Sequence, residues 1–113
     1  MSARAALAHD VGKYIARIAR NVPAGGPFPS ALAPLLAKDL YEAPGGGRPS
    51  ARFEALAAAL PASDALDEAR AHLAAIDALE GAVREADPAA CVEACRRALE
   101  VERLLRGLAG EGA

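Results

Sequence analysis

The segment from His9 to Lys13 contains the side chains of this chain that are best suited to a reaction or to binding a phosphate. It reads His-Asp-Val-Gly-Lys, so an imidazole is followed at once by the carboxylate of Asp10, and an ammonium group comes four residues after the imidazole. A carboxylate beside an imidazole can set its tautomer or accept its proton, and a lysine one helical turn away can offset phosphoryl charge. The rest of the chain has the composition of a scaffold.

Residues 6–13 resemble the core motif of the HD-domain phosphohydrolases, in which a His-Asp pair on a helix binds a divalent metal ion that activates water. The resemblance implies that His9 and Asp10 would be metal ligands in a phosphate hydrolase. The family also needs an earlier histidine and a later aspartate, whereas His72 lies far downstream in a different context. Because two donors cannot form a closed site, we expect no metal, no cofactor and no enzyme.

The apolar pattern of the first predicted helix, residues 3–21, places His9 away from the core. At 3.6 residues per turn, His9 lies roughly 170° from the centre of the apolar stripe, and Asp10 lies roughly 90° away. We expect Ala16, Arg20 and Lys13 beside His9 on this outer face. A metal-hydrolase pair would have to point into the core instead. The stripe consists of Leu7, Val11, Tyr14, Ile15, Ile18 and Val22.

An exposed histidine on a helical bundle is similar to the arrangement in histidine-containing phosphotransfer domains and in the dimerisation helices of histidine kinases. In those proteins the histidine meets a receiver aspartate, with a basic side chain and a small or acidic residue nearby. The resemblance implies that His9 would be a phosphoacceptor supported by Asp10 and Lys13. The sequence departs from that pattern, because Gly12 precedes Lys13 and no Asn-Pro pair follows.

A third interpretation makes this segment the polar face of a helix that binds another protein, and this is the function that we expect. Residues 1–30 hold four basic residues against Asp10 alone, a local charge of +3, although the whole chain carries −2. We therefore expect an acidic or phosphorylated protein partner, or a second copy, and neither nucleic acid nor membrane. The predicted functional surface consists of His9, Asp10, Lys13, Tyr14, Arg17 and Arg20.

Gly12 is unusual in a chain so rich in alanine. A glycine in mid-helix costs about 1 kcal/mol relative to alanine. It indicates close approach of another backbone or of a ligand, or it is a neutral accident.

The composition predicts an all-α protein. The chain has 113 residues, of which 31 are alanine, and it contains neither Thr nor Trp. Alanine is the best helix former, and β-branched and aromatic residues are too few for a sheet. We expect one domain over residues 1–113, folded as a compact four- or five-helix bundle with three long helices and two short ones.

Proline, glycine and capping residues predict the helix boundaries. After the first helix, Ser30 would cap a short helix, Ser50 would cap a second short helix over 51–60, and Asp64 would begin a long helix through Val83. Asp87-Pro88 predicts the start of a last helix to about residue 108. The last two helices should form an antiparallel hairpin, and the short pair should cover the groove beside it. The first short helix should bury Leu32, Leu35, Leu36 and Leu40.

Cys91 and Cys95 lie one turn apart on the apolar stripe of the last helix, where we expect buried, reduced thiols. Reduced cysteines and the lack of a visible targeting segment favour the cytoplasm. The last helix also carries Arg96, Arg97, Arg103 and Arg106, which we expect to pair with glutamates at helical spacing.

Overall fold

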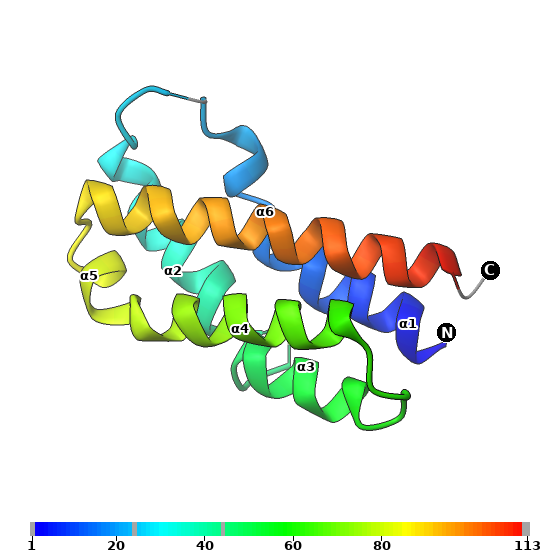
Figure 1. The fold of residues 1–113 in the computed structure, drawn as a ribbon. Helices are drawn as coiled ribbons and strands as arrows, with labels where there is room; N and C mark the ends of the chain where they lie inside the picture. Colours follow the sequence, from blue (N-terminus) through cyan, green and yellow to red (C-terminus); the bar gives the residue numbers. More distant parts are fainter. Residues whose placement is uncertain (1, 24, 44, 112–113) are drawn as a thin grey trace.

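The computed structural model describes residues 2–23, 25–43 and 45–111, and those residues contain helices and no strand (Figure 1). The prediction of a compact all-α bundle is confirmed. Its radius of gyration is 13.4 Å, close to the roughly 13 Å expected of a globular chain of about 100 residues. The α-helices are α1 (Ala3–Ala6), α2 (Ala33–Tyr41), α3 (Pro49–Ala57), α4 (Asp64–Ala78), α5 (Glu80–Arg84) and α6 (Pro88–Glu111).

The hairpin of α4 and α6 is the frame of the fold, and the two helices lie side by side along its length (Figure 1). The first turn of each helix is capped by the side chain of the residue that precedes the helix. The Asp87 carboxylate accepts a hydrogen bond from the Ala90 N–H at 3.0 Å, and Pro88 is the first residue of α6. The Ser63 hydroxyl accepts the Leu66 N–H at 3.2 Å and caps α4. The boundary predicted at Asp87-Pro88 is therefore confirmed.

The helix predicted to run through Val83 is instead interrupted at Leu79, where α4 ends and α5 begins. The Tyr41 hydroxyl donates to the Ile76 carbonyl at 2.7 Å, in the last turn of α4. Gly81 follows two residues after the break and lowers the helix propensity there. An apolar stripe can continue across such a break, so periodicity alone did not reveal it.

Neither of the two serines predicted to cap the short helices does so. Ser30 opens a 3₁₀ turn, and α2 begins after Leu32 without a side-chain cap. The residue before α3 is Arg48, two residues earlier than the predicted cap. Ser50 lies inside α3 and its hydroxyl donates to the Asp77 carboxylate at 2.6 Å. A tertiary partner on α4 thus replaces the local cap.

The two short helices pack in different places and do not jointly cover one groove. Helix α3 lies against α4 and against residues 7–13, whereas α2 packs mainly on α5 (Figure 1). Leu36 and Leu40 of α2 are buried, but Leu35 is 51% exposed and does not belong to the buried face. The extra turn before α2 sets this orientation.

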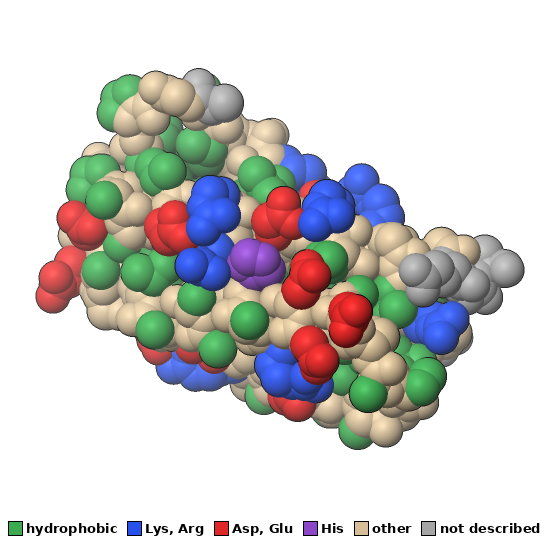
Figure 2. Space-filling view, viewed as in Figure 1, with side chains coloured by type: hydrophobic (Ala, Val, Ile, Leu, Met, Phe, Trp, Pro, Cys, Tyr) green, Lys and Arg blue, Asp and Glu red, His purple; other side chains and the backbone are tan. Residues whose placement is uncertain are grey.

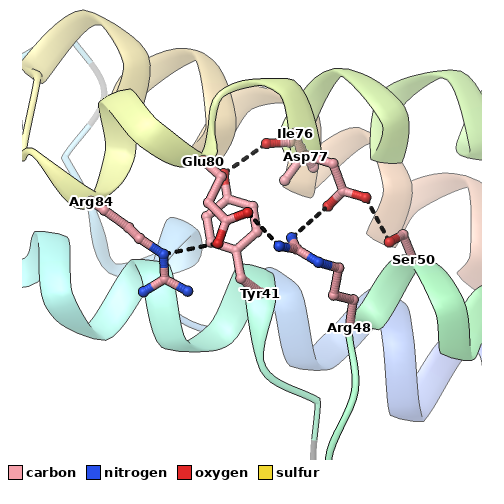
Figure 3. Close-up of polar contacts among 7 residues, drawn as sticks. All are labelled: Tyr41, Arg48, Ser50, Ile76, Asp77, Glu80 and Arg84. Atoms are coloured by element: carbon pink, nitrogen blue, oxygen red, sulfur yellow. Dashed lines mark hydrogen bonds and ion pairs between the residues drawn. The ribbon is translucent and has the colours of Figure 1, made fainter.

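A polar network ties α2 and the start of α3 to α4 and α5 (Figure 3). Arg48 contacts Glu80 at 2.5 Å and Asp77 at 3.7 Å, and Arg84 donates to Glu80 at 2.9 Å. Both guanidinium groups also lie over the Tyr41 ring, 5.6 and 5.5 Å from its centre. Hydrogen bonds from Arg48 and then Arg84 lower the pKa of Glu80. The network is structural because its charges satisfy one another.

The first predicted helix is helical over its expected length but is not a regular α-helix. After α1, residues Leu7–Lys13 form a π-helix, and Ala19–Asn21 form a 3₁₀ turn. We call residues 3–21 the N-terminal helical run. The wider π turn shifts the following side chains around the axis. As a result Ala16, expected on the outer face, is fully buried.

Candidate functional site

Gly12 lets the N-terminal helical run lie directly on α6. A Cβ atom at this position would sit 3.3 Å from the Cα of Glu102 and 3.5 Å from the Cβ of Leu105. Because glycine has no Cβ atom, the two backbones can approach this closely without such a tight contact. Of the three explanations that the sequence allows for Gly12, the close approach of another backbone is therefore confirmed. It brings His9 and Lys13 to the edge of α6.

His9 and Asp10 form a pair that Arg52 of α3 holds in place. The Asp10 carboxylate lies 2.9 Å from His9 Nδ1, and its second oxygen accepts from Arg52 at 2.9 Å. The hydrogen bond from Arg52, followed by that of His9, lowers the pKa of Asp10. An ionised carboxylate can only accept a hydrogen bond, so the proton of a neutral His9 lies on Nδ1. The lone pair is then on Nε2, and the side chain is 63% exposed.

A hollow of about 410 Å³ opens between the N-terminal helical run and α6. Alanine side chains from both helices line part of it, and its charged lining comes from both sides of the contact. We call its five polar lining residues the seam site: His9, Lys13, Arg20, Glu102 and Arg106.

Within the seam site the carboxylate of Glu102 forms ion pairs with two guanidinium groups. Glu102 is only 7% exposed, and it pairs with Arg20 across the helix contact and with Arg106 at 3.3 Å along α6. Lys13 is exposed and has no ion-pair partner among the residues that the structure describes. The site therefore has more positive than negative charge, concentrated on one hollow.

Three of the six predicted surface residues also contact α2, the residue that follows it, or α3. The Tyr14 hydroxyl donates to the Glu42 carbonyl at 3.1 Å, and Arg17 stacks on the Tyr14 ring. Arg17 also donates to Asp39 of α2 at 2.6 and 3.3 Å. Asp10 is engaged by α3, as described above. The structure thus gathers His9, Lys13 and Arg20 at the seam site. Tyr14 and Arg17 contact the α2 region, and together with His9 and Lys13 they line a second, smaller hollow of about 190 Å³.

Glu102 and Arg106 are functional candidates that the sequence did not single out. Glu102 is buried on α6 and comes directly after the buried Val101. A glutamate at a position that is expected to be buried is the one sequence feature that could have identified it as a candidate. The expected local pairing of the other arginines is confirmed. Arg103 pairs with Glu100, and both Arg96 and Arg97 pair with Glu93. Figure 2 shows this interleaving of basic and acidic side chains over the face of α4 and α6.

The surroundings of His9 and Asp10 do not favour a metal ion. Over residues 2–23, 25–43 and 45–111, no three His, Cys, Asp or Glu side chains are grouped as metal ligands. The Arg52 guanidinium on Asp10 would also repel a divalent cation. His72, the other histidine, lies on α4 and contacts Arg97 of α6 at 3.2 Å.

Cys91 and Cys95 are free and buried on α6, as predicted. Burial raises the pKa of both thiols, and that of Cys95 reaches about 11. A thiol with a raised pKa is a weak nucleophile at neutral pH. The two cysteines therefore serve as packing residues of the core.

No protein-family model, curated protein or solved structure matches this chain. None of the helices in the described part of the chain combines the length and the hydropathy needed to cross a bilayer.

Proposed function

We propose that this protein is a small helical interaction module that binds an acidic or phosphorylated segment of another protein at the seam site. The observation that carries the proposal is the charge of the hollow. Lys13, Arg20 and Arg106 contribute three positive charges against the single carboxylate of Glu102. Such a local excess attracts an anionic partner, although the chain as a whole is slightly acidic.

The charge distribution favours a protein partner over nucleic acid. Elsewhere the arginines of α6 are matched by glutamates on the same helix, so no continuous basic surface runs along it (Figure 2). A phosphate backbone needs such a surface. We place the module in the cytoplasm, where the free thiols of Cys91 and Cys95 are stable. Its role would be regulatory, and we propose no catalysis.

Lys13→Glu should weaken the binding of an acidic peptide by about tenfold or more, because it reverses the charge of a cation on the hollow. The probe is a fluorescein-labelled decapeptide rich in Asp and Glu, and the measurement is fluorescence anisotropy at two salt concentrations. The matched control is Lys38→Glu, which makes the same charge change on α2. Equal effects of the two variants, or no binding at low salt, would refute the proposal.

Phosphotransfer through His9 is a second candidate, and the bond between His9 and Asp10 favours it. The carboxylate holds the proton on Nδ1 and would stabilise the positive charge that the ring gains when Nε2 bonds to phosphorus. In the transfer, a bond forms from Nε2 to phosphorus, and the acyl-phosphate P–O bond of the donor breaks to release its carboxylate. Lys13 would offset the phosphoryl charge.

The phosphotransfer candidate predicts that receiver domains charged with acetyl phosphate transfer an acid-labile label to the protein. His9→Gln should abolish the label without changing the circular dichroism spectrum, because the His9 side chain is largely exposed. His72→Gln is the matched control and should keep the label. No label from any receiver tested would remove this candidate and leave the binding proposal in place.

A further inference from the structure

The seam site has the charge of a site for a dianion. With His9 neutral, the three cations and Glu102 sum to +2. A carboxylate on a partner would leave one positive charge unmatched, whereas a phosphomonoester carries about −1.5 to −2 at neutral pH. We infer that the seam site holds a phosphomonoester dianion on a side chain of the partner. This inference rests on the proposed function, since it specifies the group that the same site recognises.

The donors at the site also suit a phosphoryl group. Arg106 is 72% exposed in its side chain, and within the described part of the chain it shares its one acidic contact, Glu102, with Arg20. A guanidinium has five N–H donors in a planar fork, so most of those of Arg106 remain available to phosphate oxygens. Lys13 adds a point charge, and His9 Nε2 can donate when protonated. Glu102, held between the two arginines, keeps both guanidinium groups beside the hollow.

The shape of the site favours a phosphoryl group carried by a macromolecule over a free metabolite. Pockets for small molecules bury about 70–90% of the ligand surface. Here His9, Lys13 and Arg106 all remain exposed at the rim of the hollow. The site can therefore surround one charged end of a ligand while the rest stays outside. A phosphorylated side chain on a protein surface has that form.

The test compares three labelled decapeptides of one sequence that differ at a central residue, which is phosphoserine, aspartate or serine. Anisotropy titrations with the whole protein should give affinity at least about tenfold higher for the phosphopeptide than for the aspartate peptide. Inorganic phosphate should compete with the phosphopeptide. Arg106→Gln and Lys13→Gln should each bring phosphopeptide affinity close to that of the aspartate peptide. Arg103→Gln, an equally exposed arginine that pairs with Glu100, is the matched control.

The outcomes separate this inference from the proposed function. Equal affinity for the phosphoserine and aspartate peptides, with loss of both in Lys13→Gln, would overturn the phosphate inference and leave the proposed function standing. No binding of any acidic peptide would overturn both. The inference would also be overturned if Arg103→Gln reduced the preference for the phosphopeptide as much as Arg106→Gln does. The phosphopeptide would then bind elsewhere on α6.

Discussion

Arg17→Gln should lower the free energy of unfolding by about 2–3 kcal/mol, although Arg17 lies on the surface. Its partner Asp39 is only 1% exposed, and Arg17 donates to both of its carboxylate oxygens. The substitution would leave a buried carboxylate without its counter-charge. The expected loss lies below that of a fully buried pair, since water can reach the open side of Arg17. Urea unfolding followed by circular dichroism measures it.

Two further variants make this result specific. Arg103→Gln removes an arginine from an exposed surface pair, so it should leave the unfolding free energy nearly unchanged. The double variant Arg17→Met with Asp39→Leu should recover much of the loss, because it removes the buried charge together with its partner. An Arg17→Gln protein as stable as the parent would show that Asp39 does not depend on this pair.

Gly12→Leu should cost about 2–3 kcal/mol or more, because its side chain has no room between the N-terminal helical run and α6. Even the first carbon of that side chain would lie 3.3 Å from the Cα of Glu102. The neighbour is backbone of a long helix and cannot rotate away. The same contact would push apart the two helices that form the seam site, so phosphopeptide affinity should fall as well.

Alanine substitutions provide the matched comparison for Gly12. Gly107→Ala, in the interior of α6 with no atom within 4 Å of the added carbon, should stabilise the protein by about 0.5–1 kcal/mol. Gly12→Ala should lack that gain or should destabilise, because the close contact offsets helix propensity. The measurement is the change in stability of both variants, obtained from thermal unfolding. An equal gain at the two positions would mean that Gly12 does not limit the helix contact.

Features that depend on adjacent residues were predictable from the sequence. The start of α6 at Pro88 follows from a capping aspartate and a proline, both of which act within one turn. The buried face of α6, including Cys91 and Cys95, follows from helical periodicity over many turns. The all-α fold follows from the alanine content. Each of these rests on physics that needs no knowledge of the tertiary structure.

Features that depend on distant partners were not predictable in the same way. Ser50 could have capped α3, but its hydroxyl finds Asp77 on another helix. The π-helical turn at residues 7–13 buries Ala16, which an ideal α-helix would place outside. At the seam site, His9 and Lys13 were visible as a motif. Glu102, however, is 82 residues from Arg20, and only the fold brings them together.

Binding at the seam site and a structural role of Arg17 can be tested together by one paired measurement. Phosphopeptide affinity and unfolding free energy are measured for Lys13→Gln and Arg17→Gln, at a temperature where both variants are folded by circular dichroism. Lys13→Gln should lose about tenfold in affinity with unchanged stability. Arg17→Gln should lose stability and less than about threefold in affinity, through weakened long-range attraction alone. A loss of affinity in Arg17→Gln with full affinity in Lys13→Gln would show that the partner does not bind at the seam site.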